Sequence, residues 1–201
     1  MKKRNATQTK ELILNVATNE FSKYGYDGLR VDDLAARAGV NKATIYYHFK
    51  DKSFLYQTIL FDMSQFILDN VHKKLIDKKT AQEKLEAFLD AVVFVVTNKR
   101  DVAKILMQEL SFNGKNFSDE VKAEFFKIVA ILIGILKEGK ETKVFRDVDP
   151  FLIHATTVGG INYYLSMQEL AQNEDKDRFP ISFKENGVND IKEMILNYVK
   201  I

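Results

Sequence analysis

The segment 41–52 brings together side chains that are suited to binding a nucleic acid. Tyrosine, threonine and histidine side chains hydrogen-bond to phosphates and base edges, and a small alanine allows close approach to a thymine methyl group. The segment is rich in such groups and poor in aliphatic ones, which is unusual for a surface that only packs. The candidate DNA-binding residues are Asn41, Lys42, Ala43, Thr44, Tyr46, Tyr47 and His48, with Lys52 in the first turn of the following helix, where free backbone N–H groups can share its phosphate.

Two short helices and a tight turn must position these residues. Helical spacing of apolar residues predicts a first helix over 31–38, which Gly39 ends. Val40 follows in the turn, and Asn41 is a good N-cap for a second helix over 42–49. This arrangement is typical of a helix-turn-helix, whose second helix enters the major groove.

A longer motif surrounds the turn and carries a family resemblance. The stretch from Val31 to Lys52 resembles the DNA-binding signature of the TetR family of transcriptional regulators, and the similarity extends over about a quarter of the chain. Members of that family have three amino-terminal DNA-binding helices, a linking fourth helix, and a larger helical domain that dimerises and binds a ligand. The most specific parts of the match are Ala38-Gly39-Val40, Thr44-Ile45-Tyr46, His48-Phe49 and Lys52, preceded by Phe21, Gly25 and Tyr26.

The resemblance implies a phosphate contact for Lys52 and recognition-helix contacts for Lys42, Ala43, Thr44, Tyr46, Tyr47 and His48. Two positions depart from the family pattern. Arg30 stands where threonine or serine often caps the second helix, so either that helix starts differently or the arginine contacts phosphate directly. Ala43 stands where glycine is frequent, which alters how closely the backbone approaches DNA.

Helical patterns continue to the end of the chain. A first helix ends at Gly25, and Thr80 to Glu83 form a capping box before a fifth helix, although the β-branched run 91–96 resembles a strand. The fold class is therefore all-α with about nine helices: a helix-turn-helix domain over 1–50 and a ligand-binding and dimerisation domain over 51–201. The remaining predicted helices cover 51–76, which links the two domains, then 101–112, 118–139, 150–171 and 189–198, with a loop over 172–187.

Charge and composition narrow the function classes. The 201 residues carry a net charge of +2, but residues 1–52 hold ten Lys/Arg against six Asp/Glu, including the arm Lys2-Lys3-Arg4. This asymmetry is consistent with a polyanionic partner. A solvated surface with scattered lysines would explain the charge equally well. With no cysteine, no histidine metal spacing and no catalytic motif, we expect no enzyme, cofactor or metal site. The longest apolar run, 128–136, is too short to span a bilayer, and we expect a cytoplasmic protein.

Aromatic residues beyond the motif suggest a ligand cavity. Core packing is the simpler reading for any one of them, and His154 has the alternatives of an interior histidine or a ligand contact. Because the resemblance implies a cavity, we expect a largely apolar or aromatic small molecule. The candidate ligand-binding residues are Phe88, Phe94, Met107, Phe112, Phe126, His154, Tyr163, Tyr164 and Met167.

Two adjacent glycines in the helix over 150–171 suggest a subunit interface. Glycine inside a helix costs about 1 kcal/mol relative to alanine, so close helix approach at a dimer interface or a ligand would explain them. The candidate interface residues are Gly159, Gly160, Ile191, Met194, Ile195 and Tyr198. Together these features predict a homodimeric repressor that binds a palindromic double-stranded operator and leaves it when an effector binds. The alternative is a helical ligand-binding or interaction protein of the same fold without operator recognition.

Overall fold

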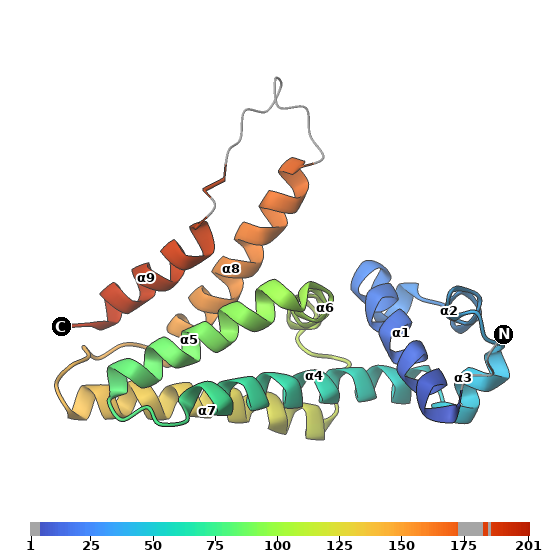
Figure 1. Cartoon of the computed structure of the whole chain (residues 1–201), viewed down its shortest axis with the longest axis horizontal. Coiled ribbons are helices and arrows are strands. Elements are labelled where there is room, and N and C mark those ends of the chain that lie inside the picture. Colours follow the sequence, from blue (N-terminus) through green and yellow to red (C-terminus); the bar gives the residue numbers. More distant parts are fainter. Residues whose placement is uncertain (1–4, 173–182, 185) are drawn as a thin grey trace. The chain divides into compact units, whose positions relative to one another are not determined.

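The computed structural model describes residues 5–172, 183–184 and 186–201. In this part of the chain every regular element is a helix, as the periodicity predicts, and nine are present (Figure 1). The arm at residues 2–4 and most of the predicted loop lie outside the described residues. The helices are α1 (Ala6–Gly28), α2 (Val31–Ala38), α3 (Lys42–His48), α4 (Lys52–Leu75), α5 (Ala81–Asn98), α6 (Arg100–Ser111), α7 (Asp119–Glu141), α8 (Pro150–Gln172) and α9 (Gly187–Val199).

Short polar side chains start several of these helices where the sequence predicts them. Asn41 accepts a hydrogen bond from the Thr44 N–H at 2.7 Å, which satisfies one of the free donors of the first turn. Thr80 and Glu83 form the predicted reciprocal capping box. The β-branched run in α5 is therefore helical and not a strand.

Several helix ends differ from the predicted ones by one to three residues, although α2 has both predicted ends. Gly25 has φ 68° and ψ 178°, so it breaks α1 as predicted, but the chain returns to helical geometry as far as Gly28. The last helix begins at Gly187, two residues before the predicted start. Fraying and capping decide such ends, and both depend on neighbours that periodicity does not reveal.

The chain folds into two compact units. The first combines the residues up to Gln65 with Asp101–Glu124, and the second combines Phe66–Arg100 with Phe125–Ile201. The first unit thus adds the start of α4, most of α6 and the start of α7 to the helix-turn-helix. The functional division near residue 50 stays a prediction.

The core of the first unit is built from α1 to α4 with α6. Phe21, Phe49 and Tyr56 are fully buried in it. Ile105 of α6 and Val121 of α7 belong to the same cluster. The three amino-terminal helices therefore pack on a base that includes a distant part of the sequence.

The second unit packs α8 against α9, with α5 against both. Lys84 of α5 and Glu138 of α7 form an ion pair at 2.7 Å within this unit. The carboxyl terminus is held by an antiparallel bridge between Phe145 and Lys200. Within the described residues, no helix combines the length and the apolar character needed to cross a bilayer.

Candidate nucleic-acid interface

The turn between α2 and α3 is fixed by one glycine and one buried face. Gly39 has φ 64°, a left-handed conformation that costs a residue with a Cβ atom about 1–2 kcal/mol. Its N–H and that of Val40 donate to the carbonyl groups at the end of α2. Leu34 and Ile45 are buried on either side of the turn, so the two helices are held as a helix-turn-helix.

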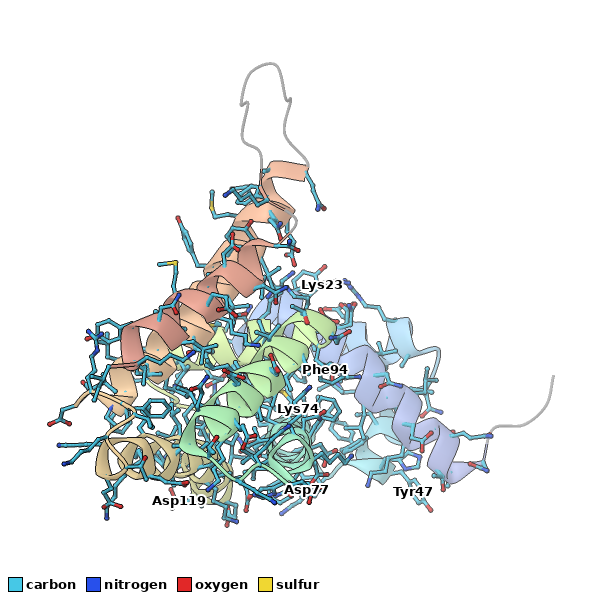
Figure 2. All side chains as sticks on the ribbon, turned by 60° about the vertical axis from the view of Figure 1, so that its left-hand side comes forward. Lys23, Tyr47, Lys74, Asp77, Phe94 and Asp119 are labelled. Carbon is cyan, nitrogen blue, oxygen red and sulfur yellow. The ribbon has the colours of Figure 1, made fainter. Side chains whose placement is uncertain are left out.

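The opposite face of α3 is open. Tyr47 is 80% exposed and Tyr46 is 43% exposed, while Ile45 is completely buried on the other side of the same helix. Figure 2 shows the Tyr47 side chain pointing away from the helices around it. Lys42 and Ala43 are also exposed, and the face as a whole presents donors to solvent.

Two polar side chains of this face are already engaged within the protein. The Lys42 ammonium donates to Asp32 of α2 at 2.9 Å, and this hydrogen bond raises the pKa of Lys42. The Thr44 hydroxyl donates to Asn41 at 2.8 Å. A phosphate near Lys42 must therefore compete with a carboxylate, whereas Thr44 is held in one orientation.

Arg30 occupies the N-cap of α2 without capping it. Its backbone is extended, with φ −95° and ψ 143°, and its side chain makes no cap hydrogen bond. The helix nevertheless begins at Val31, so the missing cap does not move the helix start. Asp32 and Asp33 lie in this first turn, where the positive end of the helix dipole stabilises their carboxylates. The Arg30 side chain is exposed, and its phosphate contact stays a prediction.

Lys52 starts α4 beside an aromatic ring. Asp51 caps the helix by accepting from the Phe54 N–H at 2.7 Å. The Lys52 ammonium lies 4.5 Å from the centre of the Tyr26 ring. Partial burial lowers the pKa of Lys52.

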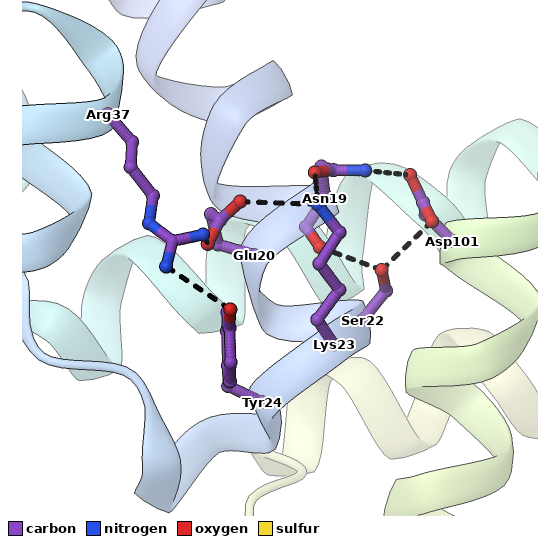
Figure 3. A network of polar contacts seen from close by, with 7 residues as sticks. All are labelled: Asn19, Glu20, Ser22, Lys23, Tyr24, Arg37 and Asp101. Atoms are coloured by element: carbon purple, nitrogen blue, oxygen red, sulfur yellow. Dashed lines mark hydrogen bonds and ion pairs between the residues drawn. The ribbon is translucent and has the colours of Figure 1, made fainter.

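A polar network holds α1 in place (Figure 3). The apolar periodicity of the sequence did not predict it. The Arg37 guanidinium of α2 donates to Glu20, a buried carboxylate on α1, and to the Tyr24 hydroxyl at 3.2 Å. From α6, Asp101 accepts from Asn19 at 3.1 Å and from Ser22 at 2.9 Å. The signal in the sequence was a glutamate on the apolar side of an amphipathic helix, which requires a buried partner.

The candidate ligand residues differ in burial and are divided between the two units. Phe88 is buried in the core, whereas Phe94 and Phe126 are exposed. Figure 2 places Phe94 on the surface of α5. His154 is half-buried with its ring edge-on to Phe125 at 5.8 Å, and burial lowers its pKa. Of the remaining candidates, Met107 and Phe112 fall in the first unit, and Tyr163, Tyr164 and Met167 in the second.

The candidate interface residues lie on the packed pair α8 and α9. Gly160 would place a Cβ atom 3.8 Å from Ile191, so this glycine faces α9, whereas a Cβ atom at Gly159 would meet nothing within 4 Å. Ile195 is buried, while Met194 and Tyr198 are exposed. Within the described residues, no three histidine or carboxylate side chains gather as a metal site would require.

Comparisons with known proteins agree with this architecture. The model of the bacterial regulatory proteins of the tetR family matches residues 13–59, and that of the tetracyclin repressor-like C-terminal domain matches residues 78–166. The fatty acid metabolism regulator protein of Bacillus subtilis is 27% identical over 136 residues, which cover 67% of this chain and 70% of that protein. IcaR of Staphylococcus aureus, a negative regulator of a biofilm operon, is 42% identical over 48 residues, 24% of this chain and 26% of that protein.

A solved structure extends the likeness over nearly the whole chain. The structure assigned to a fatty acid metabolism regulator of Clostridium perfringens has a TM-score of 0.70 at 25% identity, covering 94% of this chain and 99% of that one. Both family models fall on the segments that the fold requires: one on the helix-turn-helix and one on the helices that follow. The chain therefore belongs to the TetR family of DNA-binding transcriptional regulators, which are transcription factors and not enzymes.

Proposed function

We propose that the protein is a homodimeric repressor that binds a palindromic operator through α3 and releases it when a largely apolar small molecule binds. The observation that carries DNA recognition is the two-sided character of α3. Ile45 and Phe49 anchor the helix in the core, and the tyrosines between them stand in solvent. A helix fixed on one side and open on the other can enter a major groove without refolding.

The proposed DNA contacts fall into two groups. Ala43, Thr44, Tyr47 and His48 face the base edges and the neighbouring phosphates, while Arg30, Lys42, Tyr46 and Lys52 hold the phosphate backbone, with Asn41 fixing the start of α3. Phosphate contacts supply most of the affinity and make it strongly dependent on salt. Base contacts supply the specificity.

An exposed apolar stripe on α8 and α9 supports the dimer. Leu152, Tyr163 and Leu170 are exposed at helical spacing on α8, and Met194 and Tyr198 are exposed on α9. A patch of this kind on two packed helices suits an isologous interface with a second copy. The two α3 helices of such a dimer must lie about 34–36 Å apart to reach successive major grooves.

The relatives support an effector with an acyl chain. Two of them are named as regulators of fatty acid metabolism, and this chain is rich in phenylalanine, with 15 residues. An effector that prefers one dimer geometry shifts operator affinity by its differential binding, and typical couplings are about 1–3 kcal/mol. The proposed repressor role is further supported by the named negative regulator among the relatives.

Selection of duplexes from a random library on the purified protein, followed by fluorescence anisotropy on the enriched duplex, tests the DNA-binding part. We expect an enriched palindrome, and we expect Tyr47→Ala and Lys52→Ala each to weaken binding about tenfold. Lys122→Ala, an exposed lysine on α7, is the matched control and should bind as the wild type does. No enrichment would favour the alternative of a helical protein that has lost operator recognition.

Titration of oleate and oleoyl-CoA into the protein–duplex complex tests the effector class, and we expect these acyl compounds to release the duplex. Analytical ultracentrifugation of the Tyr163→Asp variant tests the dimer interface, and we expect this variant to sediment as a monomer. An acyl compound that raises the melting temperature without releasing the duplex would refute the coupling, and a dimer that survives the substitution would refute this interface.

A further inference from the structure

A chain of aromatic contacts joins Lys52, the proposed phosphate-binding lysine at the start of α4, to the core. Lys52 and Tyr56 are four residues apart and therefore lie on one face of α4. The Tyr26 ring lies beside both: its centre is 4.5 Å from the Lys52 ammonium and 5.0 Å from the centre of the Tyr56 ring. The kink at Gly25 comes directly before Tyr26, so the break in α1 sets the direction in which this ring leaves the helix.

The Tyr26 ring packs against buried aromatic side chains. It stacks on Phe21 with an interplanar angle of 14°, and Phe21 and Tyr56 are both fully buried. The Tyr56 hydroxyl donates to the buried carboxylate of Glu109 on α6 at 2.7 Å. The ring beneath Lys52 therefore rests on side chains that cannot rotate freely.

The acidic group that acts on Lys52 is paired with another lysine. Asp27 is the neighbouring acidic group that acts on Lys52 electrostatically, but its Oδ2 atom pairs with the Lys115 ammonium at 2.7 Å. A lysine that carries its charge over an aromatic face keeps its donors available and has lost part of its rotational freedom before DNA arrives. Such a side chain pays less entropy when it binds a phosphate.

We propose that Tyr26 is a positioning residue for DNA binding, whose ring holds the Lys52 ammonium at the amino terminus of α4 ready for a backbone phosphate. This inference rests on the proposed phosphate contact of Lys52. Tyr26 itself acts through Lys52 and touches no DNA.

A double-mutant cycle tests the inference. The affinity of the selected duplex is measured by fluorescence anisotropy between 50 and 200 mM KCl for the wild type, Tyr26→Leu, Lys52→Met and the double variant. We expect Tyr26→Leu to weaken binding about two- to fivefold per half-site. We expect Lys52→Met to lower the salt slope by about one per subunit, and the added loss of Tyr26 to have no further effect in that background.

Two control variants separate positioning from a structural role. Tyr26→Phe keeps the ring and should bind as the wild type does. Tyr24→Leu removes a neighbouring ring that lies against Arg37 instead of Lys52, so its effect should be the same with and without Lys52. Equal losses from Tyr26→Leu in both backgrounds, or no loss in the wild-type background, would overturn the inference.

A readout without DNA completes the test. In the wild type, the ring current of Tyr26 should shift the Lys52 ε-methylene proton resonances upfield, and Tyr26→Phe should preserve that shift. Resonances at ordinary positions would refute the contact, even if Tyr26→Leu fails to fold. A preserved contact with no salt-slope change in Lys52→Met would instead refute the phosphate contact, and the inference would fall with it.

Discussion

Removing the Tyr56 hydroxyl is expected to weaken the first unit by more than an ordinary hydrogen bond would. Glu109 is 3% exposed, and its carboxylate accepts from the Tyr56 hydroxyl at 2.7 Å and from the Asn116 side chain at 2.8 Å. Tyr56→Phe keeps the buried ring and removes one donor from a buried anion. Hydrogen bonds to charged groups contribute about 1.5–3 kcal/mol, so we expect the free energy of unfolding to fall by about 2 kcal/mol.

Hydrogen exchange of the amides in α1 and α4, with far-UV circular dichroism in urea, measures this loss. A change of that size lowers the melting temperature by roughly 4–8 °C for a chain of this length. The matched control is Tyr47→Phe in the same unit, whose hydroxyl is in solvent and whose loss should cost less than about 0.5 kcal/mol. A Tyr56→Phe protein as stable as that control would show that the hydrogen bond between Tyr56 and Glu109 makes no net contribution to the free energy of unfolding.

Burial and the bond to Glu109 also raise the pKa of Tyr56 well above its usual value, so this hydroxyl stays a donor up to high pH.

Two further predictions concern the second unit. Gly139→Ala should destabilise it by about 1–3 kcal/mol in urea unfolding, because the added Cβ atom would overlap the buried Phe145 ring. Gly134→Ala, which has open space in the same helix, should stabilise this unit by up to about 1 kcal/mol. Equal effects of the two substitutions would contradict this difference in packing. Because burial lowers the pKa of His154 below the usual value for histidine, the unfolded chain takes up the proton first. The free energy of unfolding should therefore fall as the pH drops below about 6.5. His154→Leu should flatten this dependence, and the exposed His72→Leu should not.

Local sequence signals are sufficient to predict the helical fold and the recognition element. Apolar periodicity, short capping side chains and Gly39 act locally, so the helix-turn-helix and most helix starts could be predicted from neighbouring residues alone. In the structure, Ile45 and Phe49 are buried beneath the exposed tyrosines of α3. The positions of helix ends could be predicted less precisely, because several of them depend on contacts with distant segments.

Which distant side chains meet depends on how the helices pack in the folded protein. Nothing in the spacing of residues 26, 52, 56 and 109 shows that the rings of Tyr26 and Tyr56 lie between a half-buried lysine and a buried carboxylate on α6. The candidate ligand residues show how little periodicity says about such contacts. Phe88 and Phe94 belong to the same helix, yet Phe88 is buried in the core and Phe94 is exposed on the surface. Periodicity assigns a residue to one face of its helix, whereas long-range packing decides what that face meets.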